Sequence, residues 1–126
     1  MASVVELRQS ERILIDAPRI EALFRQMGDR AAEEFVMDSI EDISDRLAEI
    51  ELATRIGVLG DVPPKAERVS GLCTGIGLLS LARVAGDLGA AATRGDTVAY
   101  RAVWERLVRI GDRSLAQVWE MPGLSL

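Results

Sequence analysis

The stretch Val62 to Leu79, VPPKAERVSGLCTGIGLL, holds the side chains whose types and spacing are best suited to binding or chemistry. Apolar residues at steps of three and four predict one buried helix stripe: Ala66, Val69, Cys73 and Ile76. The opposite face carries Pro64, Glu67, Gly71 and Thr74. Glycine within a helix costs about 1 kcal/mol relative to alanine. A helix with Gly71 one turn after the carboxylate of Glu67 therefore indicates a surface that another molecule approaches closely.

The residue types needed for several common catalytic sites are missing. The chain contains no histidine and one cysteine, which excludes an ordinary zinc site, an internal disulfide and a histidine-based triad. Cys73 lies on the apolar stripe, which is typical of a small core residue. The glycines of GLCTGIG follow no predicted strand, so they do not indicate a nucleotide loop. We expect no enzyme activity, no metal and no cofactor.

The helix that carries Glu67 must be positioned by other helices. Asp16 is a good N-cap, Pro18 suits a first turn, and Gly28 would end a short first helix. A long helix then begins at Asp29, with a buried stripe of Ala32, Val36, Ile40, Ile43, Leu47 and Ile50. Its other face is acidic: Glu33, Glu34, Asp38, Glu41, Asp42, Asp45, Glu49 and Glu51. Such a run is either a solvated face or a charged rim that selects a basic partner.

Two more helices follow. Asp61 is expected to cap the Glu67 helix, and Gly77 either bends the chain after it or packs closely. The segment from Leu79 to Thr93 carries small residues that permit close helix contact: Gly86, Gly89, Ala90, Ala91 and Ala92. Gly95 and Asp96 separate it from a last helix, Thr97 to about Trp119. That helix would bury Tyr100, Val103, Leu107, Ile110, Leu115 and Val118, and the two tryptophans, Trp104 and Trp119, are interpreted as core or groove fillers.

These elements predict an all-α fold, an antiparallel four-helix bundle with a short N-terminal extension. We expect one domain over residues 1–126 with a core from about 15 to 119. The run Ile13-Leu14-Ile15 is expected to pack extended against the bundle. Val4, Val5 and Leu7 can form a short helix, and the tail from Met121 to Leu126 is expected to be loose.

The composition limits the classes of binding partner and the cellular compartment that we expect. A net charge of −5 argues against nucleic acid and anionic membrane partners. No apolar run reaches the roughly 18 residues of a membrane span, and the start MASVVELRQSER does not look like a secretory signal. We therefore expect a cytoplasmic protein. Lys65 is the only lysine, and this preference for arginine hints at a bacterial source.

The sequence from Glu67 to Gly77 resembles the helix motif of histidine-containing phosphotransfer (HPt) domains, His-x-x-Lys-Gly-x-x-x-x-Ile-Gly. Gly71, Ile76 and Gly77 fall at the spacing of that family. Glu67 takes the place of the phosphate-accepting histidine, and Ser70 that of the lysine. The stretches on either side of this motif resemble the family more weakly, so that the resemblance as a whole runs from about Ile15 to Trp119. It implies the HPt-like four-helix bundle.

In that family an imidazole accepts the phosphoryl group of a receiver domain. A carboxylate is weakly nucleophilic and would meet an acidic partner pocket, so the resemblance implies binding of a response-regulator receiver domain or a histidine kinase without phosphate relay. Glu67 would then mimic the charge of phosphohistidine or approach a divalent cation in the receiver; otherwise it is an ordinary solvated glutamate. The expected docking face comprises Pro64, Glu67, Ser70, Gly71, Thr74 and Leu78, with Asp38, Glu41, Asp42 and Asp45 as its rim.

A second interpretation is a structural or dimerising bundle unrelated to signalling, in which the small-residue face packs on a second copy. We expect a monomer, with a homodimer as the alternative. An enzyme is the third class, which the missing nucleophile–base pair disfavours.

Overall fold

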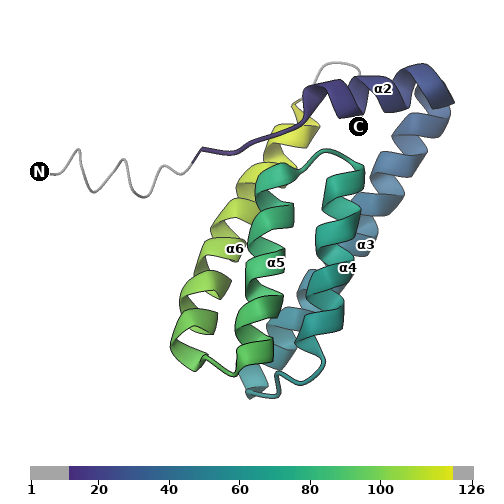
Figure 1. Cartoon of the computed structure of the whole chain (residues 1–126). Helices are drawn as coiled ribbons and strands as arrows, with labels where there is room; N and C mark the ends of the chain where they lie inside the picture. The colour runs from purple at the N-terminus through teal and green to yellow at the C-terminus, as the bar shows by residue number, and fades with distance from the viewer. Residues whose placement is uncertain (1–11, 121–126) are drawn as a thin grey trace, which may run out of the picture.

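The computed structural model describes residues 12–120, and within them the chain is all-helical, as predicted. The helices are α2 (Ala17–Met27), α3 (Asp29–Ile56), α4 (Val62–Gly75), α5 (Leu79–Arg94) and α6 (Thr97–Trp119). The predictions for Val4, Val5, Leu7 and the tail after Glu120 fall outside the described residues. Figure 1 shows α3, α4, α5 and α6 lying alongside one another as a helical bundle.

Local capping signals set most helix ends where the sequence indicated. The Asp16 carboxylate accepts a hydrogen bond from the backbone N–H of Arg19 (3.1 Å) and thereby caps α2. The carboxylate of Asp96 does the same for α6, accepting from the N–H of Ala99 (3.0 Å). Gly95 ends α5 in the left-handed conformation. Asp61 is the exception: it precedes α4, but its side chain makes no capping hydrogen bond because its own backbone is already helical (φ −95°, ψ 0°).

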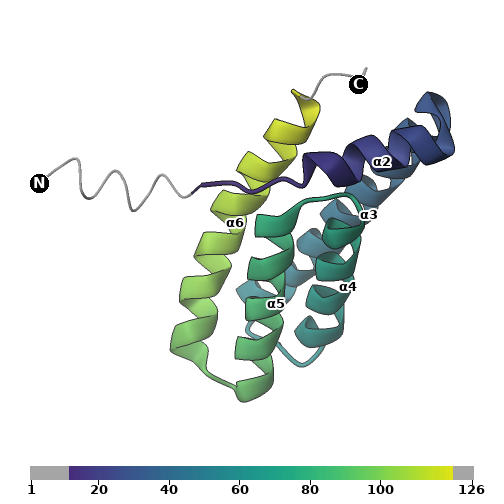
Figure 2. The same cartoon turned by 45° about the horizontal axis from the view of Figure 1, so that its top comes forward.

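The core lies between helices that follow one another in the chain. Helix α4 packs on α3 and on α5, and α6 packs on α5, while α2 contacts α3 and crosses one end of the bundle (Figures 1 and 2). Aliphatic side chains fill the interior, among them Ile43, Ile50, Val69, Leu81, Leu88 and Ile110. Such a core is held by burial of apolar surface, with aromatic residues contributing little.

The glycines of α5 divide into two kinds. A Cβ on Gly89 would lie 3.3 Å from the Cβ of Ala66, so Gly89 does permit close approach of α4 and α5, as predicted. Gly86 is exposed, and a Cβ there would meet nothing within 4 Å. The prediction that Gly86 supports tight packing is therefore wrong, because this residue lies on the outer side of α5.

The segment before α2 is joined to the turn between α4 and α5. Ile15 and Leu78 form an antiparallel bridge, which confirms that this segment packs extended. The backbone N–H of Asp16 donates to the carbonyl oxygen of Gly77 (2.8 Å). Gly77 has φ +81°, and an added Cβ would lie 2.8 Å from the carbonyl oxygen of Asp16. Only glycine satisfies both conditions, so Gly77 both bends the chain and allows this contact.

We predict that Gly77→Ala destabilises the fold by about 3 kcal/mol or more, because it adds a backbone clash to the strain of a positive φ. Gly57→Ala is the matched control, since Gly57 has φ +76° but nothing within 4 Å of its added Cβ. That control should cost about 1 kcal/mol. Urea unfolding of both variants measures the difference, and equal losses would contradict the clash at Gly77.

Candidate functional site

Four of the predicted docking residues form an open strip along α4. Pro64, Glu67, Gly71 and Thr74 are all exposed, and we call them the exposed strip. A Cβ placed on Gly71 would meet no atom within 4 Å. The opposite side of α4 is buried through Ala66, Val69 and Cys73, each 0% exposed. The buried apolar stripe and the exposed strip thus lie on opposite sides of α4, as the spacing of the residues predicted.

Leu78 and Ser70 do not belong to this open surface in the same way. Leu78 is 0% exposed, so its prediction as a docking residue is wrong: the bridge to Ile15 and the core enclose it. Ser70 is half-buried, and its hydroxyl donates to the carbonyl oxygen of Ala82 (2.9 Å). Ser70 therefore joins α4 to α5 and contributes only part of its surface to the face.

Three residues of the exposed strip, Pro64, Glu67 and Gly71, line one side of a shallow groove between α3 and α4, with a volume of about 460 Å³. Its lining adds Phe35, Ser39, Arg68, Leu72 and Gly75 to Pro64, Glu67 and Gly71. Phe35 is 39% exposed and is one of two phenylalanines in the chain. The predictions from the sequence did not include Phe35 as a site residue. Its position on an otherwise acidic helix face was the available signal.

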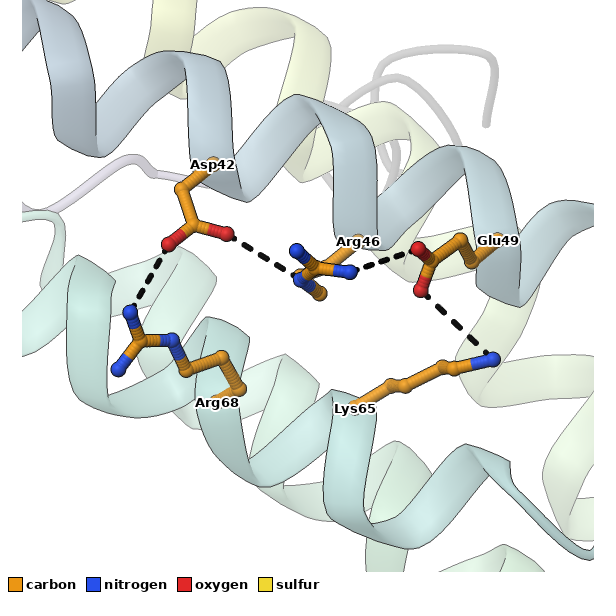
Figure 3. A network of polar contacts seen from close by, with 5 residues as sticks. All are labelled: Asp42, Arg46, Glu49, Lys65 and Arg68. Carbon is orange, nitrogen blue, oxygen red and sulfur yellow. Dashed lines mark hydrogen bonds and ion pairs between the residues drawn. The ribbon is translucent and has the colours of Figure 1, made fainter.

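The acidic rim is partly neutralised by cations of α4 (Figure 3). One oxygen of Asp42 accepts from Nη2 of Arg68 at 2.9 Å, and the other accepts from Nε of Arg46 at 3.2 Å. The hydrogen bond from Arg68 is the main cause of a lowered pKa of the Asp42 carboxyl, and Arg46 adds to it. Asp42 is therefore held in place as a structural anion between α3 and α4.

The network continues along α3 to a second contact with α4. Arg46 donates through Nη1 to Glu49 (2.6 Å), and this hydrogen bond raises the pKa of the Arg46 guanidinium. Lys65 of α4 lies 3.6 Å from the other oxygen of Glu49. The remaining predicted rim residues, Asp38, Glu41 and Asp45, are exposed and form no ion pair within residues 12–120. Their carboxylates therefore face solvent.

Other candidate side chains offer no chemistry at this face. Cys73 is buried in the core, and its burial raises the pKa of the thiol to about 12, so the prediction of a core cysteine is confirmed. Trp104 is half-buried and lines a groove between α3 and α6, as a groove filler should. Trp119 is 43% exposed, so its interpretation as a core or groove filler is wrong.

Between residues 12 and 120, no three side chains of His, Cys, Asp or Glu gather closely enough to hold a metal ion. None of the helices in that range combines the length and the apolar character needed to cross a membrane. What the exposed strip and its groove can do is bind another surface: they present the exposed carboxylate of Glu67, an aromatic side chain and a bare stretch of helix.

We predict that Arg68→Gln raises the pKa of Asp42 toward the ordinary carboxyl value of about 3.9. Because the folded pKa is lowered, the stabilising contribution of Asp42 is present above that ordinary value and is lost as the pH falls through the lowered one. An NMR titration of the Asp42 carboxyl carbon measures the change. Lys65→Gln removes a cation whose ion pair, within residues 12–120, is with Glu49, and it should leave the Asp42 titration where it was. No change in Arg68→Gln would mean that Arg46 alone holds the carboxylate.

Comparisons with known proteins do not identify a function for the exposed strip and its groove. No protein-family model, no curated protein and no solved structure matches this chain. The interpretation therefore rests on the geometry of the exposed strip and on the resemblance within residues 67–77.

Proposed function

We propose that this chain is a pseudo-HPt protein of a bacterial two-component phosphorelay system, built as an antiparallel four-helix bundle of the HPt kind. It binds a receiver domain or a histidine kinase through the exposed strip and relays no phosphate. The observation that carries the proposal is the position of Glu67. It is exposed on α4, one turn before Gly71, at the place that the resemblance gives to the phosphate-accepting histidine.

The bare surface around Gly71 supports docking. Any larger side chain at this position would stand above the groove, whereas glycine leaves α4 open to a partner helix or loop. Phe35 borders the same groove and supplies apolar area of the kind that anchors protein interfaces. A partner that covers Gly71 would therefore also bury part of Phe35.

The chemistry of the strip supports binding without transfer. Glu67 is a weak nucleophile and carries a negative charge at neutral pH. Ser70 uses its hydroxyl hydrogen for the carbonyl oxygen of Ala82, and it brings no cation to steady a phosphoryl group. Glu67 acts either as a partial mimic of a phosphorylated side chain or as a ligand toward a cation held by the partner. In both roles the protein acts by occupying the docking surface of its partner, and it thereby sequesters a receiver or modulates a kinase.

The unpaired acids of α3 give the docked complex its electrostatic selectivity. Asp38, Glu41 and Asp45 lie on the same helix as Phe35 and face solvent. Exposed rim charges act more on association rate and partner choice than on affinity. Partners with basic residues around the docking surface are therefore favoured.

A structural or dimerising bundle is the alternative. The exposed Phe35 next to Gly71 also suits a second copy of the chain, because the same apolar surface would be buried between two protomers. The two functions differ in one observable: a dimerising bundle has twice the chain mass in solution, and a monomeric docking protein does not.

We predict that Gly71→Arg abolishes or weakens partner binding by about tenfold or more, because its side chain would occupy the groove. The assay is a binding screen against receiver and histidine-kinase domains by titration calorimetry, with light scattering to measure the mass. Gly86→Arg is the matched control, since Gly86 is also an exposed helical glycine with open space but lies on α5. If light scattering shows a dimer that Gly71→Arg dissociates, and no domain binds, the dimerising function is correct.

We predict that Glu67→His converts the protein into a phosphate acceptor, because it places an imidazole nucleophile on the exposed strip at the position that the resemblance gives to the phosphate-accepting histidine. Labelled phosphate from a phosphorylated receiver should appear on the variant as an acid-labile adduct. The natural chain should remain unlabelled. Transfer to the natural chain would overturn the proposal, and so would failure of both forms to bind any receiver or kinase.

A further inference from the structure

A second pocket lies on the far side of α4 from the α3 groove and is basic, unlike the chain as a whole. It has a volume of about 540 Å³ and is formed by the segment before α2 together with α4, α5 and α6. Its polar lining consists of three arginines and three hydroxyl residues: Arg12, Arg83, Arg106, Ser70, Thr74 and Ser80. Between residues 12 and 120, no carboxylate is among the lining residues, although the chain has 20 acidic residues and a net charge of −5. We call it the arginine pocket.

The positive charge of the arginine pocket is only partly neutralised. Arg106 lies 3.9 Å from Asp87, which is a weak ion pair between partly exposed groups. Neither Arg12 nor Arg83 forms an ion pair with a carboxylate within residues 12–120. Most acids of the bundle lie on α3, where two of them bind cations of α4 instead. At least two guanidinium groups therefore face the pocket with their charge available to an anion.

The hydroxyl groups differ in what they can offer. Ser70 and Thr74 donate their hydrogens to backbone carbonyl oxygens, of Ala82 and of Ser70 itself. Ser80 instead accepts the backbone N–H of Leu14 (2.8 Å), which leaves its own hydroxyl hydrogen to donate. Ser80 thus adds a neutral donor to the two arginines.

The start of α5 contributes its field to the same pocket. Leu79 and Ser80 are its first residues, and the positive end of the helix dipole favours an anion there. Their N–H groups already donate to the carbonyl oxygens of Gly77 and Leu14, so the direct hydrogen bonds must come from side chains. Arg83 lies one turn further along the same helix and is the residue best placed to supply them.

We propose that the arginine pocket binds an anion of the phosphate class, either free phosphate or a phosphomonoester group. Planar guanidinium groups bind tetrahedral oxyanions through paired hydrogen bonds, and three of them converge here from three separate segments. The site is independent of the Glu67 groove: Arg12, Arg83 and Ser80 play no part in the docking proposal, so either can fail alone.

The first test is a titration of the full chain with inorganic phosphate at constant ionic strength, with chloride as the reference anion, followed by NMR. Shifts should centre on Ser80, Arg83 and the N-terminal turn of α5. Arg83→Gln should weaken binding by about tenfold, the loss of one charge-assisted contact. Arg12→Gln should weaken it in the same direction. Arg94→Gln is the matched control: an exposed arginine on the same helix, outside the pocket, whose loss should leave phosphate binding unchanged.

A second arm distinguishes the source of the phosphate group. Phosphatidylcholine vesicles are compared with and without phosphatidic acid. Binding of inorganic phosphate alone assigns the pocket to a free anion, and Arg83-dependent binding only to vesicles with phosphatidic acid assigns it to a lipid headgroup. The proposal is overturned if neither probe binds, or if Arg83→Gln and Arg94→Gln weaken binding equally, since that reports screening by overall charge.

Discussion

Burial of one side of α4 is the constraint on which the candidate surface depends. A helix of 14 residues is marginal by itself, so its stability comes from packing of its apolar stripe between α3 and α5. Val62, Ala66, Val69 and Cys73 are fully enclosed. Since that stripe can face only inward, the residues half a turn away must face solvent. Glu67 and Gly71 are presented by the same packing that stabilises the helix.

Charge pairing between α3 and α4 adds orientation to this packing. Arg68 and Lys65 reach across to Asp42 and Glu49, and Arg46 links the two carboxylates along α3. Partly exposed ion pairs of this kind contribute little to stability. Their effect is to sort the acids of α3 into two groups, those that align the helices and those that face solvent.

The bundle consequently has two sides of opposite character. The α3–α4 side combines the exposed carboxylate of Glu67 with an aromatic residue, whereas α4, α5, α6 and the segment before α2 bring three arginines together with hydroxyl groups. The exposed Thr74 and half-buried Ser70 lie between the two sides, on the helix that borders both.

Local physics determined what the sequence could predict by itself. The periodic apolar stripes of α3, α4 and α6, the caps at Asp16 and Asp96 and the helix end at Gly95 depend on residues within a few positions, and the structure has all of them. Contacts between distant segments were decided only by the tertiary structure. Ile15 encloses Leu78, Phe35 borders Gly71, and Arg12 meets Arg83 and Arg106 in one pocket. The spacing of residues along the chain does not predict these contacts, because they form only when the packed helices bring separate surfaces together.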